Sequence, residues 1–524
     1  MLTNRFFRPA LIACLVAFHL VSYSQKLPAN WQNLDLSKDS VYGVGTNRAY
    51  DELLKGKTST SVIVAVIDDG TDINHEDLKA HIWKNKNEKM GNSVDDDKNG
   101  YIEDINGWNY LGNKIQSYEI DNYEVTRLVR TYQSFFKYPS DIKNNPDEYA
   151  NYQKALTIYE SRKKEYETID KRLSSSITYF ESLQKKLNRD TLSIKDLQEN
   201  PSTDSLIIIT TTRLIANLQK GTAYTKAIAD MKRTMDSNKS HLQYHVNLQY
   251  DPRLLVGDDD ANINDRNYGN RTVVSEGDHG THVSGIIGAV RNNDKGIDGI
   301  ADNVQLMILR VVPDGDERDK DIALAIRYAV DNGARVINMS FGKPLSYKKE
   351  FIDDAVQYAI SKNVLLVHAA GNEALDLDVE QRFPNPNYKK VKGNAWKNWI
   401  DVGASAADGN PGGFSNYGKN YVDLFAPGVK INSTILNNEY APKNGTSMAA
   451  PVVAGVAALI ISYYPSITAP QLKELLMKTV YKPTQQVKKP GAPDTMISYS
   501  DLCKSAGIVN VYNALKLADK KYGK

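Results

Sequence analysis

The chain is poor in cysteine, with only Cys14 and Cys503 among its 524 residues. Cys14 lies in an N-terminal stretch that we expect to be cleaved off, so the mature chain would keep a single thiol. A single thiol excludes an intrachain disulfide as a source of stability. If the protein is secreted, it must be stabilised in another way, and a bound structural calcium ion is the obvious candidate.

The chain also lacks an excess of charge of either sign. Lysine and arginine number 65 against 63 aspartates and glutamates, which gives a formal net charge of +2. This balance does not predict binding to nucleic acid through bulk electrostatics. Hydrophobic residues make up 41% of the chain, which permits a sizeable core in one large domain or several ordinary ones.

No apolar segment at the N-terminus is long enough to stay in a membrane. The run at residues 10–21 is too short to span a bilayer permanently. It follows Arg5 and Arg8 and precedes the small residues Ser22–Ser24, which is the pattern of a secretory signal peptide, residues 1–24. We therefore expect export to the periplasm, the cell surface or the medium. The alternative is a lipid anchor on Cys14, but Arg8 leaves almost no apolar run before that cysteine.

Three motifs carry residue types that nucleophilic catalysis uses. Asp68 ends a Val- and Ile-rich run that is typical of a buried parallel strand, at the end where open α/β sheets place ligands. His279 is the second residue of another motif, residues 278–285, where a helix is expected to begin. Ser447 precedes a long apolar run, so its hydroxyl would lie at the positive end of a helix. Aspartate, histidine and serine in this order are one of three triad orders found on unrelated folds.

These motifs resemble the catalytic boxes of the subtilisin-like serine proteases, or subtilases. The matching stretches are residues 66–70 (VIDDG), 279–282 (HGTH) and 445–451 (GTSMAAP), and residues 336–342, 369–372, 414–418 and 425–428 match further landmarks. The resemblance implies an α/β fold of three layers, with a mainly parallel sheet flanked by helices. It also implies a secreted serine endopeptidase that cleaves protein or peptide substrates and needs no cofactor for catalysis.

The resemblance assigns a role to each matched residue. Ser447 would be the nucleophile, His279 the general base and Asp68 the group that orients the imidazole. Asn372 would stabilise the oxyanion together with the backbone N–H of Ser447. Asp69 is the weaker candidate for the aspartate, because successive strand side chains point to opposite faces. The substrate-binding residues would be Ser340, Phe341, Gly342, Ala369, Ala370 and Gly371.

Specificity is less readable from the sequence. The small residues at 369–371 suggest a roomy, mostly apolar pocket and broad endopeptidase specificity, and Glu373 at its rim could admit a basic side chain. Two other function classes stay open. A catalytically inactive binding module would have lost the nucleophile or the base, which are both present here, whereas an enzyme of peptide transfer or self-processing would carry the same residues.

A long insertion separates the first two motifs. Asp68 and His279 lie 211 positions apart, where subtilases usually have a few tens, so residues 112–250 are interpreted as inserted. Apolar residues spaced three and four apart from Tyr166 to Leu187 predict one long helix, and residues 206–235 predict a second. Together they would form an antiparallel helical hairpin. This hairpin would dock a partner, cover the active site or pack passively on the body.

Acidic and histidine clusters offer candidate metal sites. Residues 95–104 carry oxygen-bearing side chains at alternating positions, with glycine at the sixth, like the first half of an EF-hand loop. The expected ligands of a structural calcium ion are Asp95, Asp97, Asn99 and Asp104. Residues 258–260 form a second, less favoured acidic cluster. His241 and His245 lie four apart without an evident third ligand, so we interpret them as a surface pair.

These patterns divide the chain into a signal peptide (1–24), a short N-terminal segment (25–60), a discontinuous peptidase domain (61–111 and 251–515), the helical insertion (112–250) and a tail (516–524). Strands at 304–312, 334–339 and 364–370 are expected to alternate with helices at 320–332 and 351–362. The segment 25–60 leaves little room for the folded propeptide that subtilases commonly carry.

Overall fold

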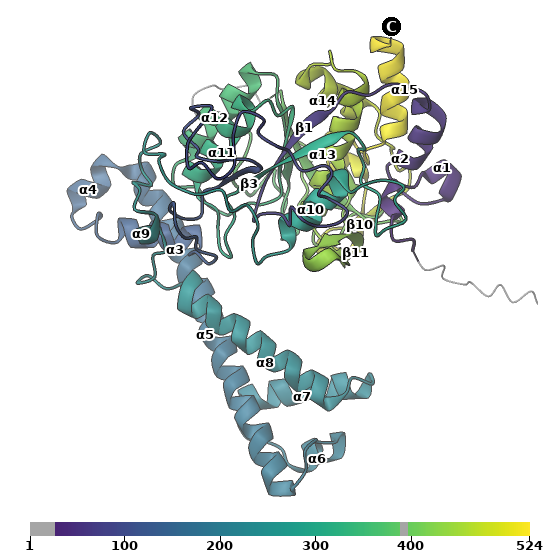
Figure 1. The fold of residues 1–524 in the computed structure, drawn as a ribbon. Coiled ribbons are helices and arrows are strands. Elements are labelled where there is room, and N and C mark those ends of the chain that lie inside the picture. Colours follow the sequence, from purple (N-terminus) through teal and green to yellow (C-terminus); the bar gives the residue numbers. More distant parts are fainter. Residues whose placement is uncertain (1–26, 388–396, 524) are drawn as a thin grey trace, which may run out of the picture.

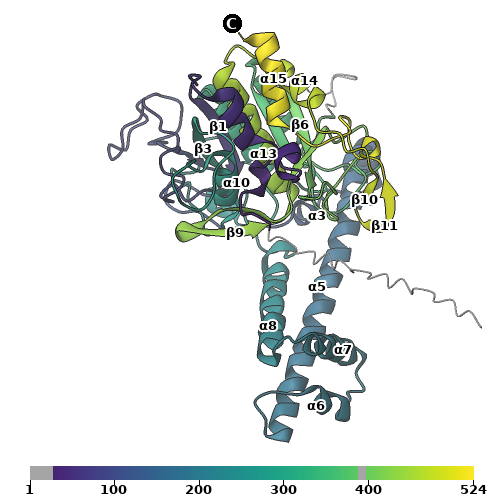
Figure 2. The same ribbon diagram turned by 90° about the vertical axis from the view of Figure 1, so that its right-hand side faces the viewer.

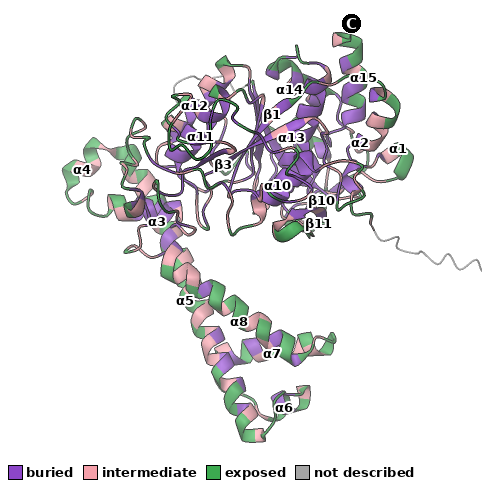
Figure 3. Cartoon of the chain, viewed as in Figure 1, coloured by how far each residue is buried: buried purple, intermediate pink, exposed green. Residues whose placement is uncertain are grey.

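The computed structural model describes residues 27–387 and 397–523, so the predicted signal peptide lies outside the described residues. A sheet of seven parallel strands forms the centre, in the order β2-β3-β1-β4-β5-β6-β7. The strands are β1 (Val62–Asp68), β2 (Gly107–Asn109), β3 (Val304–Arg310), β4 (Val336–Met339), β5 (Leu365–Ala369), β6 (Trp399–Ser405) and β7 (Leu424–Pro427). The strands are almost completely buried because helices cover both faces, as Figures 1 and 3 show.

Alternating side chains of β1 show how the two helical layers are built. Val64 and Val66 pack with the layer of α10 (His279–Gly288), α13 (Thr446–Tyr463), α14 (Ala469–Lys478) and α15 (Val511–Tyr522). Ala65 and Ile67 pack on the opposite side with α11 (Asp319–Asp331) and α12 (Lys349–Ser361). The predicted three-layer α/β fold with a mainly parallel sheet is therefore confirmed.

Helix α13 begins at Thr446, one residue before Ser447, and runs through the middle of the protein. Among the described helices it alone is long and apolar enough to cross a bilayer, but 89% of its apolar window is buried inside the protein. It is therefore the core helix of this layer, packed against α10 and several strands of the sheet. Burial of this kind holds the start of α13 in a fixed position at the carboxyl edge of the sheet.

Short elements complete the body, the name we use for the described part of the peptidase domain and of the N-terminal segment. The N-terminal segment forms η1 (Trp31–Asn33), α1 (Leu36–Asp39), α2 (Thr46–Ala49) and η2 (Tyr50–Leu54). Of these, α2 and η2 pack on α15. Two antiparallel pairs, β8 (Ile431–Ile435) with β9 (Glu439–Lys443) and β10 (Val487–Lys489) with β11 (Ala492–Ile497), flank the sheet, with the turns η4 (Leu436–Asn438) and η5 (Tyr499–Asp501).

Residues 112–250, which we interpret as an insertion, are largely helical, but the second long helix predicted there does not form. The elements are α3 (Glu124–Tyr132), α4 (Pro139–Asn144), α5 (Pro146–Leu187), α6 (Ile194–Glu199), α7 (Ser205–Gln219), α8 (Tyr224–Ser240), η3 (His241–His245) and α9 (Arg253–Val256). The predicted helix 206–235 is wrong because the chain turns at Gly221, whose φ of +86° is left-handed and ends α7. Three helices, α5, α7 and α8, therefore replace the expected two-helix hairpin (Figure 1).

The insertion has two parts that differ in their surroundings. We call residues 117–132 and 241–250, together with the adjoining residues 251–260 of the peptidase domain, the stem, and residues 167–237 the arm. The arm leaves the body as a mostly exposed bundle (Figures 2 and 3). Asn238 at the arm's base donates a hydrogen bond to the carbonyl oxygen of Tyr166, 2.8 Å away, so α5 and α8 lie side by side where the arm begins.

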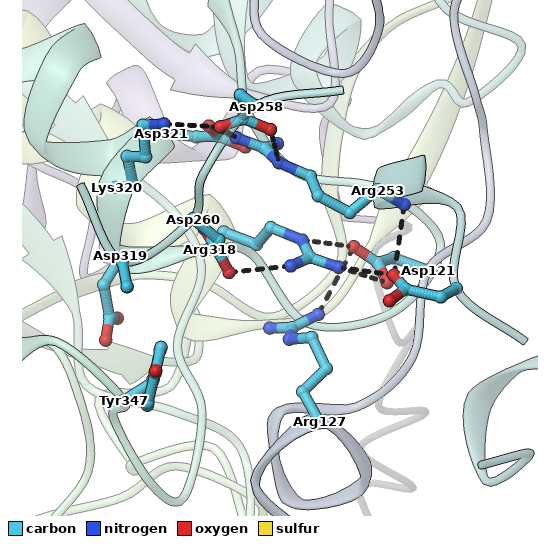
Figure 4. Close-up of polar contacts among 12 residues, drawn as sticks. Asp121, Arg127, Arg253, Asp258, Asp260, Arg318, Asp319, Lys320, Asp321 and Tyr347 are labelled. Carbon is cyan, nitrogen blue, oxygen red and sulfur yellow. Dashed lines mark hydrogen bonds and ion pairs between the residues drawn. The ribbon is translucent and has the colours of Figure 1, made fainter. Parts of the chain in front are cut away.

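Buried ion pairs fasten the stem to the body. Arg318, next to α11, pairs with Asp121 of the stem at 2.8 Å and with Asp260 at 2.7 Å (Figure 4). Arg253 of the stem pairs with Asp321 at 2.8 Å, and Asp258 forms ion pairs with both Arg253 and Lys320. Asp258 and Asp260 are therefore neutralised by cations, which argues against residues 258–260, the less favoured acidic cluster, as a calcium site.

Candidate active site

Asp68, His279 and Ser447 come together at the carboxyl edge of the sheet. Asp68 ends β1, His279 is the first residue of α10 and Ser447 is the second residue of α13. All three line one cleft of about 660 Å³. Nδ1 of His279 lies 2.7 Å from Oδ1 of Asp68, so the carboxylate holds one ring nitrogen and leaves Nε2 available to a reacting group.

Ser447 is held by a different neighbour in this structure. Its hydroxyl donates to the carbonyl oxygen of Ser340 at 3.0 Å, while the Ser340 hydroxyl donates to the carbonyl oxygen of Ser447 at the same distance. The Ser447 hydroxyl must therefore rotate before it can donate to His279. Such a rearrangement is expected where a hydrogen bond forms only in the complex with substrate.

Charge around His279 favours its protonated form. Enclosure by protein atoms lowers the pKa of the imidazole, but the charge and hydrogen bond of Asp68 and the charge of Asp69 raise it more, to about 9. The imidazole becomes neutral, and so able to accept a proton, only as the pH rises through that value. A neutral imidazole that can accept a proton is therefore favoured at alkaline pH.

Asp69 lies close to His279, but its carboxylate bonds backbone N–H groups and not the imidazole. Its carboxylate accepts hydrogen bonds from the N–H groups of Gly280 at 2.7 Å and His279 at 3.3 Å. It therefore caps the first turn of α10 instead of orienting the imidazole. Burial and the charge of Asp68 raise the pKa of Asp69 to about 6. Asp68, the last residue of β1, and Asp69, which follows it, thus bond different atoms of His279: the side chain and the backbone.

Asn372 has a fixed orientation in the cleft. Its Oδ1 accepts hydrogen bonds from the backbone N–H of Thr446 at 2.8 Å and from the Thr446 hydroxyl at 3.0 Å. The amide oxygen is thereby engaged, which leaves Nδ2 as the end that can donate into the cleft. Thr446, which the motif comparison did not single out, also accepts a hydrogen bond from the N–H of Gly371 at 3.0 Å.

The six expected substrate-binding residues all line the cleft. A buried pair that sequence reasoning missed supports them: His368 bonds Asp401 through Nδ1 at 2.8 Å and the carbonyl oxygen of Phe341 through Nε2 at 3.0 Å. His368 therefore ties the end of β5 to the segment after β4. The sequence offered no signal for this contact beyond a histidine inside an apolar strand.

The rim of the pocket is less acidic than the sequence suggested. Glu373 pairs with Arg382 at 3.2 Å and accepts a hydrogen bond from Asn416 at 2.7 Å. Both charged residues line the cleft, and Arg382 is the more buried of the two. The carboxylate is therefore matched within the protein, and the interpretation that Glu373 would simply attract a basic side chain loses its physical basis.

The stem of the insertion forms part of the cleft wall. Glu119 and Ile120 line it together with residues 312–317, and Ile120 forms a parallel bridge with Asp314. Arg127 donates to the carbonyl oxygens of Asp316 at 2.8 Å and Glu317 at 3.0 Å. These residues were missed because their contacts join positions about 190 residues apart, which no local pattern reveals.

The two histidines of the stem are not a surface pair. His245 is buried, and its Nε2 bonds the carbonyl oxygen of Asp314 at 2.9 Å. Nδ1 of His241 lies 2.6 Å from Nδ1 of His245, and the two rings stack on Tyr166 and Tyr123 respectively. The prediction of a surface pair is wrong, because these rings pack between α5 and the cleft edge.

The acidic turn groups different residues from those expected. Glu88, Asp95 and Asp97 bring carboxylate oxygens within 4.8 Å of one another, which suits the oxygen chemistry of calcium. Asp104 is instead buried against the Tyr328 hydroxyl, and Oδ1 of Asn99 accepts the N–H of Tyr101 at 2.8 Å. Asp95 and Asp97 thus belong to the cluster and Glu88 was missed, while Nδ2 of Asn99 donates to Asp97 at 3.3 Å and to Asp104 at 2.9 Å and so links the cluster to Asp104.

Comparison with known proteins indicates the same family as the sequence motifs. A family model described as "Subtilase family" matches residues 59–501. The chain is 43% identical over 185 residues to a thermophilic serine proteinase of Bacillus sp. (strain AK1), which is 35% of this chain and 42% of the relative. It is 37% identical over 202 residues to subtilisin DY of Bacillus licheniformis, which is 38% of this chain and 69% of the relative.

Among solved structures, a chain described as a protease from Pseudoalteromonas arctica aligns at 30% identity with a TM-score of 0.37, over 46% of this chain and 70% of that chain. The sequence match thus spans less than half of the thermophilic proteinase and more than two thirds of subtilisin DY.

Proposed function

Because this chain belongs to the subtilase family, whose members are serine-type endopeptidases, we propose that it is a secreted endopeptidase with an Asp68–His279–Ser447 triad. The observation that carries the proposal is the convergence of these three side chains and Asn372 on one cleft, with the Asp68–His279 hydrogen bond at 2.7 Å. No metal or organic cofactor takes part in the proposed chemistry.

In the proposed mechanism, Oγ of Ser447 attacks the scissile carbonyl carbon while Nε2 of His279 takes the hydroxyl proton. Asp68 keeps the imidazole oriented and stabilises the imidazolium. Nδ2 of Asn372 and the N–H of Ser447 donate to the oxyanion. His279 then gives its proton to the leaving amine, and the acyl-enzyme is hydrolysed by water. The cleft between residues 314–317 and 340–342 would hold the substrate backbone in an extended form.

The test is covalent labelling with a serine-directed phosphonate, read by mass spectrometry. A single adduct on Ser447 is expected, and none on Ser447→Ala, whose turnover should fall by about 10⁶, the value known for the same change in subtilisin itself. Asn372→Ala should lower kcat by about 10²–10³, again a value from subtilisin. A folded protein that gains no adduct at any pH up to about 10 would refute the proposal.

Broad specificity is part of the proposal. The small residues at 369–371 and the internal Glu373–Arg382 pair support a pocket without one dominant charge. A panel of peptides that differ only before the scissile bond should be cleaved at comparable rates for several apolar residues. Cleavage confined to one residue type would contradict this part.

Export and calcium binding complete the proposal. Secreted protein should begin near Gln25 when its N-terminus is sequenced. Glu88, Asp95 and Asp97 would hold a structural calcium ion, since their carboxylates converge. Calcium should raise the thermal midpoint of the wild type but not of Asp95→Asn, and equal midpoints with calcium and with a chelator in the wild type would refute the site.

A further inference from the structure

The arm has a groove of its own, apart from the active-site cleft. It has a volume of about 500 Å³ and lies between α5, α7 and α8. Figure 1 shows α7 and α8 running apart from the turn that joins them, while α5 closes the open side. The residues that line it are Arg172, Leu173, Thr210, Arg213, Leu214, Asn217, Thr222, Lys226, Ala227, Asp230, Met231 and Thr234.

The floor of this groove is apolar. Leu173, Leu214 and Ala227 are buried, and Met231 packs partly buried beside them. Leu214 and Ala227 belong to the small core of the arm, which also contains Phe180. The floor is therefore held in shape by the arm itself, and apolar side chains of a bound molecule would find a preformed surface there.

The rim of the groove is basic. Arg172, Arg213 and Lys226 project around it from three different helices. Across the described residues, none of the three side chains forms a hydrogen bond or ion pair, which contrasts with the paired cations of the stem. The only acidic residue of the lining, Asp230, faces Arg233 at 3.4 Å. Three positive charges around an apolar floor thus have no ion-pair partner within the described part of the protein.

We propose that this groove is a docking site for an acidic segment of a protein substrate, with carboxylates on its rim and apolar side chains on its floor. Charge complementarity selects the occupant: the arginines offer paired N–H donors to carboxylates, and Lys226 offers a point charge. An amphipathic helix laid between α7 and α8 would present both kinds of side chain on one face. The role as a substrate-recruiting site rests on the proposed peptidase function.

Binding is tested first on the full chain carrying Ser447→Ala, so that the result does not depend on catalysis. The probe is a fluorescein-labelled synthetic peptide of repeated Glu-Glu-Leu-Leu units, measured by fluorescence anisotropy. The triple variant Arg172→Glu, Arg213→Glu, Lys226→Glu should weaken binding at least about tenfold, and added salt should weaken wild-type binding. A probe with glutamine in place of glutamate should bind about tenfold more weakly than the acidic probe.

A matched control has the same change of charge away from the groove: Lys154→Glu, Lys164→Glu, Lys185→Glu, three exposed positions of α5. It should change the affinity by less than about twofold. Equal losses in both triple variants, no loss in the groove variant, or equal affinity for the glutamine probe would each overturn the proposal. Circular dichroism of both variants verifies that the arm has kept its helices.

Catalysis is then measured with one protein substrate that carries either the Glu-Glu-Leu-Leu tail or its glutamine version. The acidic tail should raise kcat/KM in the wild type and the control variant but not in the groove variant, whereas a short peptide should be cleaved equally by all three. If the tail binds but does not raise kcat/KM, the groove is no recruiting site. If no substrate of any kind is cleaved, the proposed function fails while the binding result stands.

Discussion

The stem and the arm belong to one insertion, but they are held by different forces. Asp121 and Arg127 of the stem are almost completely buried: Asp121 pairs with Arg318 of the body, and Arg127 pairs with Asp121 and donates to backbone carbonyl oxygens of the body. The ion pair Lys232–Glu181 of the arm has side chains that are 49% and 52% exposed, and the arm's apolar core is a small separate cluster. An exposed pair stabilises a protein by less than about 1 kcal/mol, whereas the loss of one partner of a buried pair costs about 3–5 kcal/mol.

This difference divides the insertion by function. The stem supplies Glu119 and Ile120 to the cleft and holds the carbonyl oxygens of residues 316 and 317 through Arg127, so it belongs to the enzyme. The arm begins where Tyr166 and Asn238 meet and contributes no residue to the lining of the active-site cleft. The comparison therefore predicts large effects from changes in the stem and selective effects from changes in the arm.

The largest effect is expected for Asp121→Asn. The variant leaves Arg318 and Arg127 buried without their shared carboxylate, so the free energy of unfolding should fall by about 3–5 kcal/mol in urea. The rate of peptide cleavage should fall as well, because the stem residues that line the cleft are then held less firmly. The matched control in the arm, Glu181→Gln, should lose less than about 1 kcal/mol and keep full activity. Equal effects would refute the division into stem and arm.

The carboxylate of Asp121 should also make the stability of the folded protein depend on pH. Although burial alone would raise it, the pKa of Asp121 is lowered by Arg318 and Arg127. A lowered pKa stabilises the folded state fully above the unfolded value, about 3.9, and the contribution is lost as pH falls through the folded value. This acidic part of the stability curve should be present in the wild type and absent in Asp121→Asn.

Phe180→Ala should affect the arm alone. Phe180 is buried in the arm's own cluster, and its truncation should cost about 3–5 kcal/mol there. Hydrogen exchange should accelerate in α6 and α7, while the rate of cleavage of a short peptide stays unchanged. A parallel loss of peptide cleavage would show that the arm supports the active site.

Asp69→Asn should have the smallest effect on stability and a defined effect on pH dependence. Asparagine keeps a carbonyl oxygen for the N–H of Gly280 but removes a charge that raises the pKa of His279. In the wild type, kcat/KM should rise with pH and level off above about 9, because His279 must be neutral. The variant should reach its plateau at lower pH. An unchanged or higher midpoint would contradict the role of Asp69.

The side chains proposed as catalytic could be selected from the sequence because each lies at the end of a local pattern. Asp68 ends a buried strand, and Ser447 lies at the start of a very apolar helix. The spacing of apolar residues in the sequence, which differs between strands and helices, therefore indicates both positions. The stem was not predictable, since Arg127 and Arg318 act on residues far away in sequence. Gly221 was the readable sign that residues 206–235 form two helices, but apolar spacing continues on both sides of it and masked the break.

The most direct test of the division is removal of the arm. Residues 168–236 would be replaced by a short glycine-serine linker, which the contact between Tyr166 and Asn238 allows. The shortened protein should take up the phosphonate on Ser447 and cleave a short peptide within about twofold of the full chain, while it loses the response to an acidic tail on a protein substrate. A folded, shortened protein that labels or cleaves more than about tenfold more slowly would show that the arm is part of the catalytic unit.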